Sequence, residues 1–289
     1  MAISAVADAL SGTGGTMARD DDPELVEAAV PFGLKTMEAV LEETPEHRGL
    51  LLALSSGFVQ YGVAFLDQRA DEVEDRSLEE AEALRARARK LFRRALGYGF
   101  RNLEVEHEGF REGMSSSLET TVARATAEDV PALYWTSAAY GLYISHSKND
   151  PDAIADLPLV RALAERALAL DPDWNQGALH ELMISLEASL PQGSVERARA
   201  HFDRAVALSK GSKVGPYVTL AEAVCVKEQK AAEFHQLLDQ ALAIDVEAFP
   251  EQRLANVIMQ RRARRLKAVS GDLFLEDVGE PETETDAGP

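Results

Sequence analysis

The chain has 289 residues, enough for one sizeable hydrophobic core or two small ones. Its 49 acidic residues outnumber the 30 lysines and arginines, and a formal charge of -19 disfavours nucleic acid and anionic membrane surfaces as partners. The single cysteine, Cys225, excludes an internal disulfide and a thiolate metal cage. Ala, Leu, Glu and Arg dominate the composition and favour an all-α fold.

Residues 1–21 are expected to form a flexible lead-in, because the run SGTGGT at 11–16 is too rich in Gly and Ser to favour a helix. No basic residue precedes Arg19 and no continuous apolar segment occurs before it, so this start does not resemble a signal peptide. The run GLLLAL at 49–54 is far shorter than the roughly 18 residues that cross a bilayer. We expect a soluble chain that is either cytosolic or preceded by a leader upstream of Met1.

Three helices are expected in the first third of the chain. Asp22-Pro23-Glu24 supplies an N-cap acid, a proline at the first helical position and a first-turn acid, and predicts a helix that runs to about Glu43. A second helix is expected over 50–73 and a third over 78–96. Residues 97–129 hold several glycines and the polar run SSSLETT, which predicts an irregular connection with one short helix.

From residue 130 onwards a pattern repeats. Trp135, Trp174 and Tyr217 are each followed four residues later by alanine, and the helices expected to close these units end in Ala-Leu or Ala-Val pairs spaced 38 and 36 residues apart. An aromatic residue followed by a small one, with a second helix closing the unit, is the tetratricopeptide pattern, whose length is about 34 residues. Residues 22–275 are therefore predicted to form stacked helix pairs of degenerate tetratricopeptide-like repeats with a concave wall.

The end of the chain is expected to change character. A final helix from Glu251 to about Val269 would cap the stack. The tail over 276–289 carries six acids, two prolines and no base, so it cannot bury enough apolar surface to fold and is expected to be disordered.

Two motifs invite a catalytic interpretation and fail its requirements. His180-Glu181 opens the run HELMI, but a zinc-protease helix needs a second histidine at the position of Ile184, so neither a metal nor another cofactor is expected. Ser145 and Lys148 match the spacing of a serine acyl-transfer pair without its companion motifs. Lys148 is better explained as a cation at a helix C-terminus, and a hydrolase remains only as a third interpretation.

An aromatic cluster suggests a binding wall. Tyr134, Trp135, Tyr140 and Tyr143 lie within ten residues of a chain that is 6% aromatic. These rings either form a helix interface or line an apolar cavity or a partner surface on the inner wall of the stack. Other residues on the helices that open each unit would join this wall: Trp174, His180, Glu181, Tyr217 and Glu222.

Several stretches together resemble the T-components of tripartite ATP-independent periplasmic (TRAP) transporters, the TatT proteins. They reach from about Ala2 to Phe274 and include DDDPELVEAAVPFGLKTMEAVLEETPEHRGLLLALSSGFVQYGVAFL, VPALYWTSAAYGLYISHSKNDP, ALDPDWNQGALHELMISLE, RARAHFDRAVALS, GPYVTLAEAVCVKEQ and PEQRLANVIMQRRARRL.

The resemblance implies a non-enzymatic periplasmic lipoprotein whose tetratricopeptide-like helix pairs surround a pore or cleft. It further implies a homotrimer that pairs with the substrate-binding P-subunit of the transporter and holds or passes a hydrophobic organic-acid or lipid-like ligand. In the matching stretches, the wall-lining candidates are Tyr134, Trp135, Lys148, Trp174, His180, Glu181, Tyr217 and Glu222. The competing interpretation is a cytosolic tetratricopeptide adaptor that grips a peptide in its groove.

Overall fold

The computed structural model describes residues 2–12, 14–190 and 192–275, and this part of the chain is helical without a strand. The all-α prediction is confirmed. The elements, with π-helical turns at η1 and η3 and 3₁₀ turns at η2, η4 and η5, are α1 Ala2–Ser11, α2 Gly14–Ala18, α3 Pro23–Glu43, α4 Arg48–Tyr61, η1 Gly62–Asp67, α5 Gln68–Val73, α6 Leu78–Glu106, α7 Phe110–Ser116, α8 Leu118–Ala123, η2 Ala127–Asp129, α9 Val130–Ser145, α10 Pro151–Ala155, α11 Leu157–Leu170, α12 Trp174–Ser189, α13 Val195–Ser209, α14 Gly215–Leu220, η3 Ala221–Cys225, α15 Ala231–Ala243, η4 Val246–Ala248, η5 Pro250–Gln252, α16 Arg253–Ala268 and α17 Ser270–Leu273.

The expected N-terminal helices are confirmed at their caps. The Asp22 carboxylate accepts a hydrogen bond from the Leu25 N–H at 2.9 Å, and Pro23 occupies the first position of α3, which ends at Glu43 as predicted. The second predicted helix is continuous through α4, η1 and α5. The helix expected at the end of the chain is α16.

The non-helical lead-in was a wrong prediction. Residues 2–11 form α1, which packs against α3 and α4 and buries Ala7 completely. Asp8 bonds His47 at the start of α4 at 3.1 Å. The Gly-rich run continues as α2, which packs against α16, so tertiary contacts outweigh the low helix propensity of its glycines. The boundaries at 21 and 275 stay predictions, and the tail 276–289 lies outside the described residues.

The third helix is longer than expected. It does not end at Leu96 but continues through Gly97 and Gly99 to Glu106, and the connection that follows holds two short helices, α7 and α8. A side chain at Gly99 would overlap the Thr136 hydroxyl of α9. Residue 99 is therefore a glycine because α6 and α9 approach closely here. In the sequence alone, this glycine had instead indicated that the helix ends.

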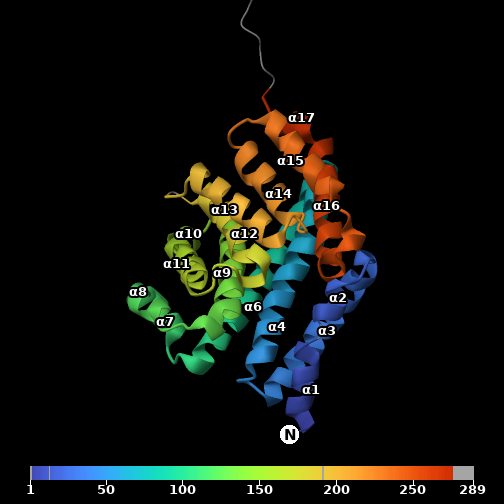
Figure 1. The fold of residues 1–289 in the computed structure, drawn as a ribbon. Coiled ribbons are helices and arrows are strands. Elements are labelled where there is room, and N and C mark those ends of the chain that lie inside the picture. Colours follow the sequence, from blue (N-terminus) through green and yellow to red (C-terminus); the bar gives the residue numbers. More distant parts are fainter. Residues whose placement is uncertain (1, 13, 191, 276–289) are drawn as a thin grey trace, which may run out of the picture.

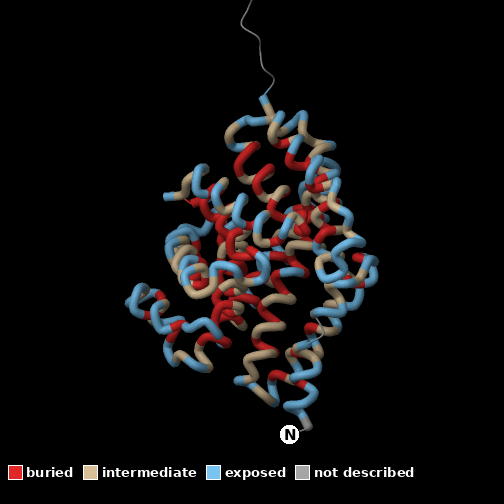
Figure 2. Tube along the Cα trace, in the orientation of Figure 1, coloured by how far each residue is buried: buried red, intermediate tan, exposed pale blue. Residues whose placement is uncertain are grey.

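Successive helices pack against one another in chain order, so the core runs through the middle of the stack (Figures 1 and 2). The larger core is built from α4, α6, α9 and α11, with Leu54, Leu103 and Leu163 fully buried. A second core, with Phe234 at its centre, joins α14, α15 and α16. Whether the packing follows tetratricopeptide geometry stays a prediction.

One helical stretch, Arg48–Val73, is long and apolar enough to cross a membrane by length and composition. Half of its apolar window is buried inside the fold, and Leu50, Leu51 and Leu54 lie in the larger core. Packing within the protein accounts for its apolar character.

Elements near the start and the end of the described chain meet, because α16 packs against α2 and α3 (Figure 1). Arg262 of α16 makes two hydrogen bonds with Glu222 of η3, at 2.8 and 2.5 Å, and a third with Asp71 of α5 at 3.1 Å. Beside it, Arg261 pairs with Glu24 of α3 at 2.6 Å. These pairs join the first helices to the last.

We predict opposite effects for two glycines of α6. Gly99→Ala should lower the free energy of unfolding by about 1–3 kcal/mol, because the added methyl group must displace Thr136. Gly97→Ala is the matched control: it has open space and should raise stability by about 0.5–1 kcal/mol. Urea unfolding followed by circular dichroism measures both, and equal effects would contradict the close approach of α6 and α9.

A second prediction concerns the ion pairs that Arg261 and Arg262 of α16 make with Glu24, Asp71 and Glu222, which we call the seam. Arg262→Gln leaves Glu222 without its cation and should lower the free energy of unfolding by about 1.5–3 kcal/mol. Arg264→Gln, an exposed position in the same helix, should stay within about 0.5 kcal/mol of the parent. The same urea titration compares them, and a neutral Arg262→Gln would show that the seam does not depend on this residue.

Candidate functional site

Two of the predicted aromatic residues, Trp135 and Trp174, pack against a third, Tyr134 of α9. Its ring centroid lies 4.9 Å from that of Trp135 and 4.8 Å from that of Trp174, the first residue of α12. All three rings are half-buried and pack against the larger core. Rings at this spacing attract one another and present a continuous apolar surface.

A partly buried carboxylate, Glu181, interacts electrostatically with one of these rings and with a buried amine, Lys213. Burial raises the pKa of Glu181 in α12, and the nearby Lys213 opposes this shift. Burial likewise lowers the pKa of Lys213, with Glu181 opposing. Burial and the charge of Glu181 also raise the pKa of Tyr134, which places Tyr134 within electrostatic reach of this pair. Glu181 therefore lies within electrostatic reach of Tyr134, and Lys213 was not among the predicted residues. The binding roles of the predicted residues stay predictions.

Lys213 is held by an unusual turn of the backbone. Asn175, Gln176 and Gly177 have φ values of 46°, 54° and 85°, a left-handed turn inside the residues of α12. Lys213 Nζ donates a hydrogen bond to the Asn175 carbonyl at 2.5 Å. Left-handed conformations cost non-glycine residues about 1–3 kcal/mol and gather at functional sites, where the surrounding structure enforces them.

The position of Tyr134 and Glu181 is informative. Both side chains are partly buried: burial raises the pKa of each, and each keeps part of its surface accessible to solvent. Glu181 also lies against Gly215, the first residue of α14, where a side chain would overlap its carboxylate. Gly215 therefore leaves room for the Glu181 carboxylate.

The other four predicted residues are engaged elsewhere. Lys148 is exposed in the turn after α9. Tyr217 packs edge-on against Phe202 with ring centroids 5.4 Å apart, and Glu222 pairs with Arg262. His180 contacts His201 of α13, Nδ1 to Nδ1, at 2.8 Å.

The hydrolase and metal interpretations gain no support. Ser145 Oγ donates to the Leu142 carbonyl at 2.8 Å, as a helical serine does, and makes no hydrogen bond with Lys148 in the described structure. No three His, Cys, Asp or Glu side chains within the described residues are grouped as a metal site would need. Burial raises the pKa of Cys225 to about 11, which leaves it an unreactive thiol.

Comparison with known proteins decides the family. A family model described as "TRAP transporter T-component" matches residues 19–274. An uncharacterized protein of Treponema pallidum (strain Nichols) is 31% identical over 264 residues, which cover 89% of this chain and 82% of that protein. The chain belongs to the TRAP transporter T-component family. The resemblance inferred from the sequence is confirmed.

Family membership gives this T-component a coarse role. It is an accessory component of a TRAP transporter, a family not known for enzymes and typically located outside the cytoplasm. The aromatic cluster with Glu181 is therefore considered as a binding site.

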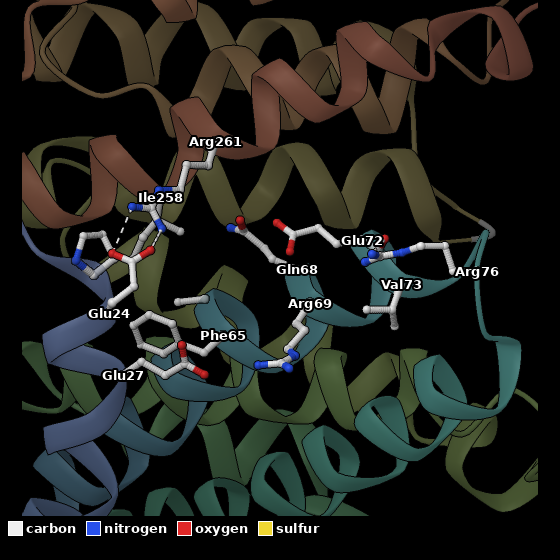
Figure 3. Close-up of a pocket in the computed structure, with 12 residues that line it drawn as sticks. Glu24, Glu27, Phe65, Gln68, Arg69, Glu72, Val73, Arg76, Ile258 and Arg261 are labelled. Atoms are coloured by element: carbon white, nitrogen blue, oxygen red, sulfur yellow. Dashed lines mark hydrogen bonds and ion pairs between the residues drawn. The ribbon is translucent and has the colours of Figure 1, made fainter.

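A pocket opens at another place in the T-component. It lies between α3, the η1–α5 segment and α16, and its volume is about 270 Å³ (Figure 3). None of the eight predicted residues lines it. Sequence patterns could not reveal it, because its walls come from three segments that are distant in the sequence.

The histidine pair predicts a pH dependence of stability. Burial, with a smaller contribution from His201, lowers the pKa of His180 from 6.5 to about 4. Between these values the unfolded chain binds more protons than the folded one, so the free energy of unfolding falls as the pH is lowered from 6.5 towards 4. At 1.36 kcal/mol per pKa unit, His180 accounts for about 2 kcal/mol of this loss by pH 4.5.

The variant His180→Gln tests this pH dependence, because glutamine can still bond His201 and does not titrate. Urea unfolding at pH 6.5 and 4.5 should show a loss about 2 kcal/mol smaller in the variant than in the parent. His146 contributes with the opposite sign: burial disfavours its charge, but the hydrogen bond to Asp67 raises its pKa overall. This contribution is common to both proteins and cancels. Equal losses in the two would contradict the assignment to His180.

Proposed function

We propose that this T-component holds or passes a hydrophobic organic-acid or lipid-like solute, in partnership with the P-subunit of its transporter. The observation that carries the proposal is the cluster of half-buried rings of Tyr134, Trp135 and Trp174, with the Glu181 carboxylate within electrostatic reach of Tyr134. Aromatic rings with a few polar groups are the usual lining of a small-molecule site. Family membership supports the pairing with a transporter.

The charges beside the rings suit an acid head group. Burial raises the pKa of Glu181, so a proton on its carboxyl group is favoured over a second negative charge when an anion approaches. Lys213, whose Nζ donates a hydrogen bond to the Asn175 carbonyl, then supplies the positive charge that attracts the acid group of the solute. The apolar part of the solute would lie against Tyr134 and Trp174. Selectivity for a solute with an acid group would come from Glu181 and Lys213 at this polar end of the site.

The proposal includes the assembly and location that the family resemblance implies. The protein would work in the periplasm, where a solute-binding P-subunit meets its permease, as a homotrimer held to the membrane by a lipid anchor. The acidic surface, with a formal charge of -19, would keep such a protein off anionic head groups except at its anchor.

The test is native mass spectrometry of the full chain purified from its own host with its P-subunit tagged. A trimer should co-purify with the P-subunit and release an apolar acid when denatured. Trp174→Ala should retain at least tenfold less of this species, about 1.4 kcal/mol of binding, because it removes one side of the aromatic cluster.

The matched control is Phe32→Ala, which removes a ring that is 79% exposed on α3 and should leave the bound species unchanged. A protein that carries no small molecule but co-purifies with a peptide partner would overturn the proposal. That outcome would favour the adaptor that binds a peptide in its groove.

A further inference from the structure

The pocket between α3, η1–α5 and α16 is separate from the aromatic cluster and has its own chemistry (Figure 3). Its volume of about 270 Å³ equals roughly nine waters at ~30 Å³ each, which suits a compound smaller than a drug. One wall is the π-helical turn η1, and π-helical turns are frequent at functional sites.

Gln68 is the polar centre of this pocket. Its residue is only 8% exposed, yet its Nε2 is buried without a hydrogen-bond partner in the described structure. Figure 3 shows the side chain projecting from α5 towards α16, among the other lining residues. A buried amide without partners destabilises a fold, so such a group calls for a ligand that can bond it. A primary amide offers a donor and an acceptor side by side.

Charges of both signs line the pocket around Gln68, and only one pair of them is bonded. Arg261 and Glu24 bond one another at the edge of the pocket. Four further lining residues, two cations and two anions, make no ion pair within the described residues: Arg69, Arg76, Glu27 and Glu72. The positive and negative charges of the lining are therefore equal in number, and most of them have no ion-pair partner within the described residues. A ligand with a single charge would satisfy only half of them.

The remaining wall is apolar. Phe65 lies on η1, and Val73 and Ile258 are buried on α5 and α16. They would cover a short hydrocarbon group next to the polar centre.

We propose that this pocket binds a small zwitterion of the α-amino-acid type with an apolar side chain. On binding, the Gln68 side chain turns its Nε2, which is covered in this structure, towards the pocket, so that the ligand carboxylate accepts hydrogen bonds from it and from Arg69 or Arg76. The ammonium group of the ligand donates to the Gln68 side-chain carbonyl and to Glu27 or Glu72. The hydrocarbon side chain packs against Phe65 and Ile258. This site goes beyond the proposed function and does not depend on it, since it shares no residue with the aromatic cluster.

Isothermal titration calorimetry of the full chain with three compounds tests the chemistry. L-leucine carries both charges, 4-methylpentanoate lacks the ammonium group, and 3-methylbutylamine lacks the carboxylate. Leucine should bind, and the two singly charged compounds should each bind at least tenfold more weakly. A singly charged compound leaves either the acidic or the basic residues of the pocket without an opposite charge on the ligand. Absence of leucine binding, or equal binding of 4-methylpentanoate, would overturn the proposal.

Two matched variants assign the binding to this pocket. Gln68→Leu keeps the volume and removes both hydrogen-bonding atoms, so it should weaken leucine binding at least tenfold. Its thermal midpoint should not fall, since a buried unpaired amide is lost, and this shows that the variant folds. Gln60→Leu changes an exposed glutamine of α4 and should bind leucine like the parent.

Trp174→Ala separates the two sites. It should keep leucine binding while losing the apolar solute, so failure of one proposal leaves the other testable. Unchanged leucine affinity in Gln68→Leu would place any binding outside this pocket and overturn the inference.

Discussion

The Arg262 guanidinium lies where α16 meets the N-terminal half of the protein. It bonds Glu222 in the C-terminal half and Asp71 in the N-terminal half, so a single side chain connects α16 with a segment 191 residues earlier in the sequence. Burial opposes its charge, but the hydrogen bonds to Glu222 raise its pKa overall, so it stays a cation. A half-buried cation is stable only while its anions stay in place. Its position therefore demands that η3, α5 and α16 meet.

The distribution of charge explains why α16 fills this place. The chain as a whole has a charge of -19, yet the residues of α16 include five arginines, one lysine and no acid. Its partners are acids of other elements: Glu24 on α3, Asp71 on α5, Glu222 on η3 and Asp239 on α15. A basic helix among acidic neighbours is attracted to several of them at once, and exposed pairs add little individually. The arrangement selects which helices α16 touches more than it adds stability.

Sequence patterns predicted what is decided locally and failed where distant segments meet. Asp22 and Pro23 set the start of α3 by bonding and conformation within one turn, so its bounds followed from the sequence. Gly99 appeared to break a helix, because the Thr136 that it accommodates lies on another element. The sequence placed Tyr134 and Trp174 on helices expected to share a wall, but it did not predict that their rings touch. Lys213 gave no signal, since its partner is a backbone carbonyl in a left-handed turn.

The seam and the pocket are physically linked through consecutive residues of α16. Arg262 holds Glu222 and Asp71, while Arg261 holds Glu24 at the rim of the pocket, and Gln68 lies one helical turn before Asp71. A ligand that bonds Gln68 can do so only while α3, α5 and α16 are in contact. By mass action such a ligand must stabilise the contact between these helices. A change that separates α16 from α3 and α5 must weaken ligand binding by the same free energy. The unpaired amide of Gln68 is thus a stability cost kept at the place where α16 meets α3 and α5, and occupancy of the pocket would relieve it.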